Sequence, residues 1–116
     1  MDDFIKVMKA LSDRTRLRIL NLLLTRNCCV CEIMQALDIS QSRASRNLGI
    51  LQNAGFLKKS RDGLWINYSV DNETINSYAT PLVKLLRNIP INHEVFNQDK
   101  ERLASAQKIG PGCGRR

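Results

Sequence analysis

The sequence is poor in histidine, proline and aromatic residues, and it has no long apolar run. One histidine and three prolines occur in 116 residues, and aromatic residues make up 5%. No apolar segment approaches the roughly 20 residues that a membrane-spanning helix needs. The chain starts with Met1-Asp2-Asp3 and lacks the basic and then apolar pattern of a secretion signal. We therefore expect a cytoplasmic protein that contacts no membrane.

Acidic residues are also in short supply. The chain has 18 Lys and Arg against 11 Asp and Glu, a formal net charge of +7 and a pI near 9.6. Excess positive charge favours a polyanionic partner, most often nucleic acid. A basic protein without such a partner has the same composition, so charge alone does not decide. The hydrophobic content of 43% is enough for one domain, or for one protomer of a dimer.

The cysteines lack the even spacing of a disulfide framework, because three of the four stand in Cys28-Cys29-Val30-Cys31. In a reducing compartment such a cluster more often binds a soft ion or reacts. Thiolate is a soft ligand, and a helix N-terminus lowers the pKa of a thiol. Buried structural cysteines are the alternative interpretation. The candidate ion ligands are Cys28, Cys29 and Cys31, with Cys113 as a weaker fourth.

No regular backbone brings all three clustered sulfurs to one ion. In a helix Cys29 and Cys31 lie ~200° apart, and in a strand Cys28 and Cys29 point to opposite sides. Three-sulfur binding would thus distort the start of the following helix or recruit a sulfur from elsewhere. A structural zinc site usually has four ligands in two separated pairs, and the sequence has no second pair. We expect no structural metal and favour a trivalent metalloid.

Residues 38–51 carry the pattern around which the chain is organised. Ala44, Leu48 and Leu51 recur at i, i+4 and i+7, which is one face of a helix. The opposite face offers serines, arginines and no acid, and it suits the major groove of DNA. A solvated helix with ordinary basic residues is the alternative interpretation. The candidate DNA-contacting residues here are Ser40, Gln41, Ser42, Arg43, Ser45, Arg46 and Asn47.

Helical periodicity also predicts three earlier helices, at about 3–11, 14–25 and 31–37. A turn of about three residues separates the third of them from the helix that reads DNA. A short helix, a tight turn and a second helix with a basic face form a helix-turn-helix.

Two predicted strands follow, at 56–60 and 64–70, joined by a turn that contains Asp62-Gly63. A basic hairpin directly after a helix-turn-helix is a wing, which contacts phosphates or the minor groove. Trp65 and Tyr68 lie on opposite faces of the second strand, and we expect one of them in the core. The candidate phosphate contacts of the wing are Lys58, Lys59 and Arg61.

A further helix is expected between Asp71 and Ile89, where five apolar residues recur at the spacing of a helix–helix seam. Pro81 either kinks this helix or lies in the first turn of a new one. The seam favours pairing with a second copy, and packing within the protomer is the alternative.

The predicted fold is mainly α with a small β-hairpin: a winged helix-turn-helix that forms a homodimer through its N- and C-terminal helices. Residues 1–90 form the DNA-binding and dimerisation domain. Apolar content falls from Pro90 onward and the chain ends in a Gly- and Arg-rich stretch. We therefore expect residues 91–116 to be a flexible extension, in which His93 has no role.

The sequence resembles the ArsR/SmtB family of winged-helix, metal- and metalloid-responsive repressors. The resemblance extends from about Met8 to Val70. It implies a homodimer that binds double-stranded operator DNA and releases it when an ion binds. The matching stretches are Ala10–Leu20, Cys29–Ile33, Ser40–Leu48, Leu51–Leu57 and Arg61–Tyr68.

Within this family, Cys29-Val30-Cys31 is similar to the Cys-Val-Cys motif of the arsenite-responsive branch. That branch takes its third sulfur from a cysteine three residues after the second, where this sequence has Met34. The resemblance then leaves Cys28, or more weakly Cys113 of the same or the partner chain, as the third ligand. Cadmium- and lead-responsive members also use cysteines from an N-terminal extension, and this sequence has no cysteine before Cys28. Zinc-responsive members use an acid and histidines of the C-terminal helix, and this sequence has only His93.

The sequence therefore predicts a DNA-binding repressor, not an enzyme, whose inducer is arsenite, As(III), or Sb(III). A response to cadmium or lead, or to oxidation of the same thiols, stays open as an alternative. A small arsenate reductase is the alternative from another class. Such an enzyme needs an anion-binding cradle beside its nucleophilic cysteine, and the cluster has no Gly-rich or Arg-bearing stretch around it.

Overall fold

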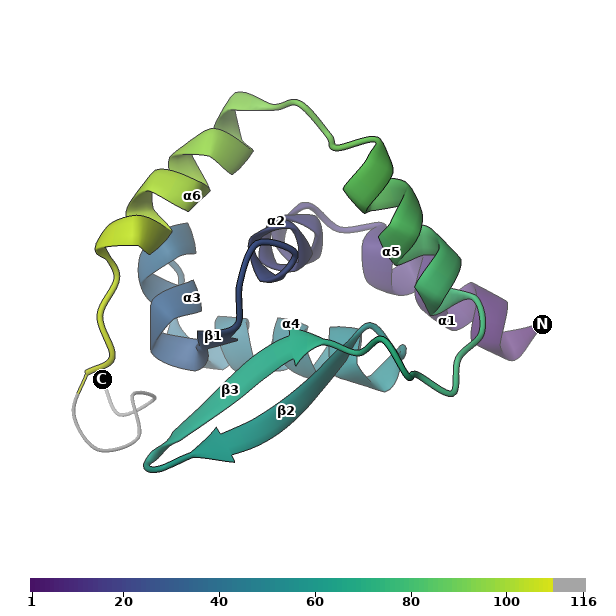
Figure 1. Cartoon of the computed structure of the whole chain (residues 1–116), viewed down its shortest axis with the longest axis horizontal. Coiled ribbons are helices and arrows are strands. Elements are labelled where there is room, and N and C mark those ends of the chain that lie inside the picture. The colour runs from purple at the N-terminus through teal and green to yellow at the C-terminus, as the bar shows by residue number, and fades with distance from the viewer. Residues whose placement is uncertain (110–116) are drawn as a thin grey trace.

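The computed structural model describes residues 1–109, and it confirms a mainly helical, winged helix-turn-helix fold. Figure 1 shows α2 near the centre, with the other helices around it and the β2–β3 hairpin along one side. No helix within residues 1–109 combines the length and the apolar character needed to cross a membrane. The helices are α1 (Asp2–Leu11), α2 (Arg14–Leu23), α3 (Val30–Leu37), α4 (Gln41–Asn53), α5 (Ala79–Asn88) and α6 (Glu94–Ser105). The strands are β1 (Cys28–Cys29), β2 (Leu57–Asp62) and β3 (Trp65–Val70).

Local side-chain signals set the helix boundaries. Asp13 caps α2 and Ser40 caps α4, each by accepting a hydrogen bond from a first-turn backbone N–H, at 3.0 Å and 3.2 Å. After α4 the chain turns at Gly55, whose φ is +94°. A Cβ at this position would meet the hydroxyl of Thr74 at 2.5 Å, so both the backbone angle and the space require glycine.

The sheet has three antiparallel strands in the order β1-β3-β2. β2 and β3 form the predicted wing, and their ladder extends to the pair Asp62 and Trp65 beside a two-residue turn. β1 is an element that the sequence analysis missed. In it Cys28 pairs with Tyr68 and Cys29 pairs with Asn67, so the cysteine cluster is attached directly to the wing.

The core confirms the inner face predicted for α4. Ala44, Leu48 and Leu51 of α4 are fully buried. Of the two aromatic residues in the wing, Tyr68 joins the main core, and Trp65 lies half-buried on the opposite face of β3. The alternation of side chains along a strand accounts for this division.

The helix expected between Asp71 and Ile89 is shorter than predicted, because α5 begins only at Ala79. Asp71 does not cap a helix: its side chain accepts a hydrogen bond from the backbone N–H of Glu73 in a turn. Pro81 lies in the first turn of α5, where its missing N–H costs no helical hydrogen bond.

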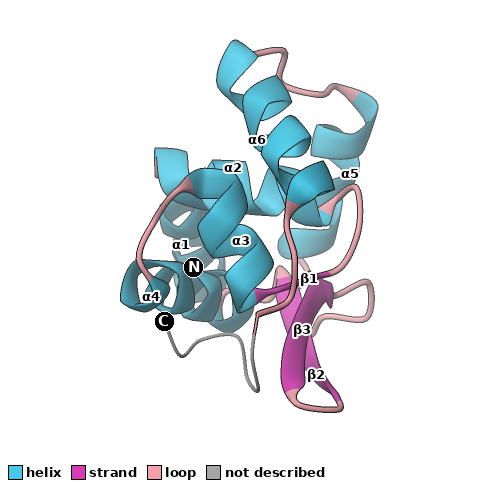
Figure 2. Cartoon of the chain, turned by 90° about the vertical axis from the view of Figure 1, so that its left-hand side faces the viewer, coloured by secondary structure: helices cyan, strands magenta, loops and turns pink. Residues whose placement is uncertain are grey.

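Residues 94–105 correct the expectation of a flexible extension, because they form α6. The helix packs against α2 and α3 (Figure 2). Its Asp99 carboxylate is fully buried and accepts two hydrogen bonds from the guanidinium of Arg18, at 2.8 and 2.9 Å. His93 has a structural role, since its Nδ1 accepts the N–H of Val95 at 3.1 Å and caps α6.

Candidate DNA-binding surface and thiol site

The outer face of α4 presents most of the predicted DNA-contacting residues. Ser40, Ser42, Arg43 and Arg46 are exposed there, opposite the buried face. Arg43 also donates a hydrogen bond from Nη2 to Oγ1 of Thr15 at 2.9 Å, which positions its guanidinium beside α2. Two cationic groups therefore lie on one surface with the serine hydroxyls.

Of the three remaining candidates on α4, Gln41 and Ser45 bond to each other, and Asn47 is buried. Gln41 donates from Nε2 to Oγ of Ser45 at 2.9 Å, and both stay partly exposed. Asn47, in contrast, is buried. Its Oδ1 accepts from Nη1 of Arg16 at 3.1 Å and its Nδ2 donates to the carbonyl of Arg43 at 3.0 Å. Asn47 thus joins α2 to α4, and we remove it from the candidate DNA contacts.

The wing carries the three predicted basic residues on β2, an edge strand of the sheet. Lys58, Lys59 and Arg61 are all exposed. Because side chains alternate along a strand, Lys59 and Arg61 project from one face of the hairpin and Lys58 from the other. Two cations are therefore available on a single face of the wing.

Two of the candidate cysteines come together at the start of α3. The Sγ atoms of Cys29 and Cys31 lie 3.1 Å apart, and both residues are fully buried. Cys29 is the N-cap of α3 with an extended backbone, φ −88° and ψ 170°, while Cys31 lies in the first turn. The ~200° separation expected within a helix does not apply, because Cys29 stands outside the helix. We call Cys29 and Cys31 the thiol pair.

Cys28 points away from the thiol pair. It packs in the main hydrophobic core, and its Sγ donates to the carbonyl of Arg26 at 3.6 Å. Burial raises the pKa of the Cys28 thiol to about 12. Because side chains alternate along β1, the Cys28 sulfur faces the main core on the side away from the thiol pair, so Cys28 leaves the candidate set. Cys113, the weaker candidate, lies outside the described residues.

A buried carboxylate fixes the start of α3. Oε1 of Glu32 accepts the backbone N–H of Cys29 at 2.9 Å, and Oε2 accepts from Nη1 of Arg26 at 3.0 Å. Burial acts to raise the pKa of Glu32, but the hydrogen bonds from Cys29 and Arg26 outweigh it and lower the pKa. Glu32 is not among the residues predicted from the sequence, although an acid three residues after an N-cap is a capping-box signal.

Comparison with known proteins gives the family. Residues 13–59 match the model of the bacterial regulatory protein, arsR family. The chain is 37% identical over 100 residues to the arsenic resistance transcriptional regulator ArsR1 of Pseudomonas putida, and the match covers 84% of this chain and 75% of that protein. This chain belongs to the ArsR family. It is therefore a DNA-binding transcriptional repressor and not an enzyme.

Other relatives have names that refer to a metal other than arsenic. A cadmium resistance transcriptional regulatory protein, the CadC homolog of Staphylococcus aureus, is 39% identical over 74 residues, which cover 63% of this chain and 61% of that protein. Among solved structures, the homodimeric winged helix-turn-helix domain of Mb0332 from Mycobacterium bovis has a TM-score of 0.65 and 30% identity. That match covers 76% of this chain and 78% of the other.

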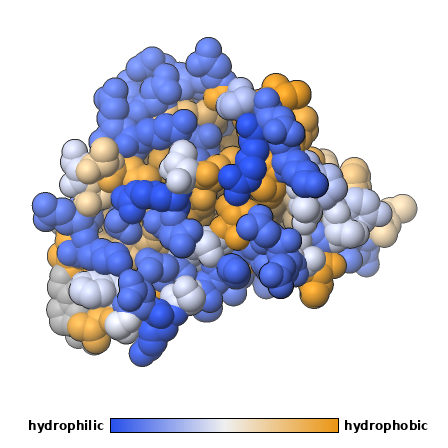
Figure 3. All heavy atoms as spheres, in the orientation of Figure 1, coloured by the Kyte–Doolittle hydropathy of each residue, from blue (hydrophilic) through white to orange (hydrophobic). Residues whose placement is uncertain are grey.

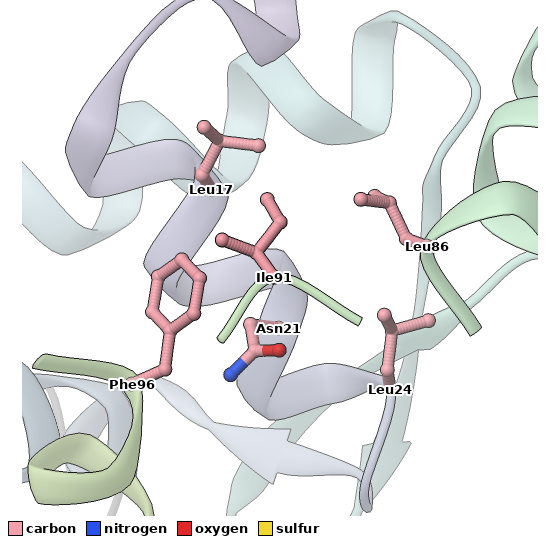
Figure 4. Close-up of a pocket in the computed structure, with 6 residues that line it drawn as sticks. All are labelled: Leu17, Asn21, Leu24, Leu86, Ile91 and Phe96. Atoms are coloured by element: carbon pink, nitrogen blue, oxygen red, sulfur yellow. The ribbon is translucent and has the colours of Figure 1, made fainter. Parts of the chain in front are cut away.

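The ArsR-family chain also has a small cavity between α2, α5 and α6. Its lining residues are Leu17, Asn21, Leu24, Leu86, Ile91 and Phe96 (Figure 4). The amide nitrogen of Asn21 is buried and has no hydrogen-bond partner within residues 1–109. The space, about 10 Å³, matches a single water molecule and is too small for an organic ligand. We therefore do not treat this cavity as an inducer site.

Proposed function

We propose that this ArsR-family repressor releases its operator when trivalent arsenic or antimony binds to the thiol pair. The observation that carries the proposal is the pair of buried sulfurs 3.1 Å apart at the start of α3. Soft ions prefer thiolate ligands, and two sulfurs this close can bind the same ion. Arsenic in the name of the P. putida relative supports the choice of element.

The position of the thiol pair links the ion to DNA binding. α3 is the first helix of the helix-turn-helix, and residues 38–40 alone separate it from α4. The N-cap of α3 is Cys29, which Glu32 holds by a hydrogen bond. An ion that changes the backbone at Cys29 therefore changes the direction of α3 and the placement of α4. A coupling of ~1–3 kcal/mol would lower DNA affinity roughly 5- to 150-fold.

Operator DNA is proposed to lie against the outer face of α4 and the wing, with the protein in the cytoplasm. Arginine recognises guanine and phosphate with paired hydrogen bonds, and lysines contribute phosphate contacts. The net charge of +7 supports such a partner and implies strong dependence on salt. The proposed contacts are Ser40, Gln41, Ser42, Arg43, Ser45 and Arg46 from α4, and Lys58, Lys59 and Arg61 from β2.

The repressor is proposed to act as a homodimer through α1 and α5. The ring of Phe4 on α1 meets the ring of Tyr78, before α5, edge to face at 5.2 Å, so the two helices share one surface. Apolar side chains gather at the surface near α5 in Figure 3. Continuous exposed apolar surface marks an interface, and the M. bovis neighbour is homodimeric. The exposed apolar residues are Phe4, Ile5, Met8, Tyr78, Leu85 and Ile89.

The test is fluorescence anisotropy of the reduced, full-length protein on a labelled promoter fragment, titrated with arsenite. We expect arsenite to lower the affinity about 5- to 150-fold. Cys29→Ala and Cys31→Ala should bind DNA and lose this response. Cys28→Ala is the matched control, because its sulfur faces the core, and it should keep the response. Cys113→Ala then tests whether that cysteine supplies a third sulfur.

Three results would change the proposal. DNA binding that arsenite leaves unchanged and cadmium weakens would replace the inducer with a divalent ion. Sensitivity to peroxide together with insensitivity to both ions would make the thiol pair a redox sensor. Loss of the arsenite response in Cys28→Ala, with the fold intact by circular dichroism, would return Cys28 to the ligand set.

A further inference from the structure

The chain after α6 crosses the thiol pair and is held there by Gln35. The carbonyl oxygen of Gln107 accepts a hydrogen bond from Sγ of Cys31 at 3.7 Å and another from Nε2 of Gln35 at 2.6 Å. The backbone N–H of Gln107 donates in return to Oε1 of Gln35 at 3.1 Å. Because Gln35 lies on α3, one side chain of the sensing helix fixes both polar backbone groups of Gln107.

The same segment also contacts the wing. Nζ of Lys108 lies 3.5 Å from Oδ2 of Asp62, at the end of β2, and 5.5 Å from the ring centroid of Trp65 on β3. Trp65 in turn packs directly against Cys29 and Cys31. The thiols, residues 106–109 and the wing are therefore one connected group of contacts.

Trp65 occupies a position that leaves its polar group unsatisfied. Its indole Nε1 is buried and has no hydrogen-bond partner among residues 1–109. Burial of an N–H without a partner is unfavourable, so a movement that lets this group reach an acceptor or water is favoured. Packing against the thiol pair and the nearby Lys108 ammonium hold the indole ring in the described part of the chain.

Trp65 and residues 106–109 together are here called the cover. We propose that an ion bound to the thiol pair displaces this cover and, through Trp65 and Lys108, shifts the wing. This inference rests on the proposed function, and it adds a route to DNA that does not pass through α4. It assigns Gln35 and Lys108 as positioning residues for the sensing site.

The size of an ion site requires something to move. A metal–sulfur bond of about 2.3 Å places two sulfurs on one ion about 3.3–3.8 Å apart for angles between about 90° and 109°. The sulfurs of the thiol pair lie 3.1 Å apart and are fully buried. Protein interiors are close-packed, so the ion gains space only if a neighbour gives way.

The neighbours on the α3 side are better anchored than the cover. Glu32 bonds the N-cap of α3 and is also paired with Arg26. The cover is held by the bonds between Gln35 and Gln107, by packing of Ala106 on the core and by Lys108 at the surface. Within residues 1–109 none of these contacts is a buried ion pair, and the Trp65 indole N–H makes no hydrogen bond. The β2–β3 ladder then transmits movement of Trp65 to Asp62, its direct partner, and along the strand that carries the basic residues.

Tryptophan fluorescence provides a direct test, because Trp65 is the single tryptophan of the chain. The reduced, full-length protein is titrated with arsenite while acrylamide quenching of Trp65 is measured, and bound arsenic is determined on the desalted protein. Displacement of the cover exposes the indole, so the quenching constant should rise about twofold or more in step with bound arsenic. Direct quenching by a bound ion would lower the emission without this rise.

Gln35→Ala removes the side chain that holds the cover and leaves the proposed ion ligands, Cys29 and Cys31, unchanged. Gln98→Ala, exposed on α6, is the matched control. Gln35→Ala should bind arsenic as the unaltered protein does, and its Trp65 should be more accessible before arsenite is added. Its arsenite-dependent loss of operator affinity should shrink about two- to tenfold. Lys108→Ala changes a residue at the surface and does not endanger folding. It should also reduce the arsenite-dependent loss of operator affinity, by less than Gln35→Ala does.

The outcomes distinguish this inference from the proposed function. Arsenic binding and DNA release with unaltered acrylamide quenching would overturn the cover and leave the proposed function standing. The same holds if Gln35→Ala and Lys108→Ala both match Gln98→Ala. No arsenic bound to the unaltered protein, with operator affinity unchanged, would overturn both.

Discussion

The two helices of the helix-turn-helix, α3 and α4, follow each other in sequence and differ sharply in burial. Six of the eight residues of α3 are buried, against four of the thirteen residues of α4. α6 packs on α3, whereas the outer face of α4 is bare within residues 1–109 (Figure 2). A side chain on α3 therefore mainly affects the fold, and an exposed side chain of α4 without a bond to the rest of residues 1–109, such as Arg46, mainly affects what binds there.

The largest expected effect concerns the helix that covers α3. Asp99→Ala removes a buried carboxylate and leaves the Arg18 guanidinium without its partner. Breaking a buried ion pair costs about 3–5 kcal/mol, and we expect about 3 kcal/mol because the Arg18 side chain, 21% exposed, can turn to solvent. Urea unfolding followed by circular dichroism measures the loss. Glu101→Ala, exposed on the same helix, is the control and should change little.

An equal stability of Asp99→Ala and Glu101→Ala would mean that the Arg18–Asp99 ion pair does not stabilise the attachment of α6 to α2.

Substitution on the outer face of α4 should give the opposite result. Arg46→Ala should lower operator affinity about 30-fold, since each copy in a dimer loses one arginine contact of at least about 1 kcal/mol. Its unfolding midpoint should stay unchanged, because Arg46 is exposed. Anisotropy and thermal unfolding are measured on the same samples. Arg14→Ala, exposed at the start of α2, is the control for a general loss of charge.

A matching loss of affinity in Arg14→Ala would show that total charge, and not the face of α4, determines DNA binding.

The wing should make a smaller contribution. Lys59→Ala should lower operator affinity by about threefold and reduce the slope of log affinity against log salt by roughly one unit per lysine lost. Anisotropy at several salt concentrations gives this slope. Lys100→Ala, on α6, should leave the slope unchanged. An unchanged or steeper slope in Lys59→Ala would exclude a phosphate contact at this position.

Two glycines flanking the end of α4 provide the smallest test. A Cβ at Gly49 would meet nothing within 4 Å, so Gly49→Ala should stabilise the helix by about 0.5–1 kcal/mol. Gly55→Ala should instead destabilise the protein, because φ is +94° and Thr74 occupies the space. Thermal unfolding compares the two. A stabilised Gly55→Ala would contradict the described turn.

Local signals explain which parts of the fold could be predicted. Periodicity, the caps Asp13 and Ser40, and the turn at Gly55 each act within a few residues, so the first four helices and the wing follow from the sequence. β1 and α6 depend on partners far along the chain. Cys28 pairs with Tyr68, and Asp99 pairs with Arg18, and neither pairing leaves a periodic pattern.

The candidate site shows the same limit. The motif Cys29-Val30-Cys31 marks the thiol pair, but the orientation of Cys28 depends on the register of β1 against β3. Asn47 is polar and stands among DNA-contacting candidates, yet its bonds to Arg16 and Arg43 turn it inward. Polar composition identifies a surface, and long-range hydrogen bonds decide which members of it are available.

The pairing of β1 with β3 also has a consequence for the order of folding. Contacts within the helix-turn-helix are close in sequence, which favours their early formation, whereas the pairing of β1 needs β3, which follows much later in the chain. We therefore expect α3 and α4 to form before Cys29 reaches its final conformation. We expect refolding followed by Trp65 fluorescence to have a phase slower than the formation of helix.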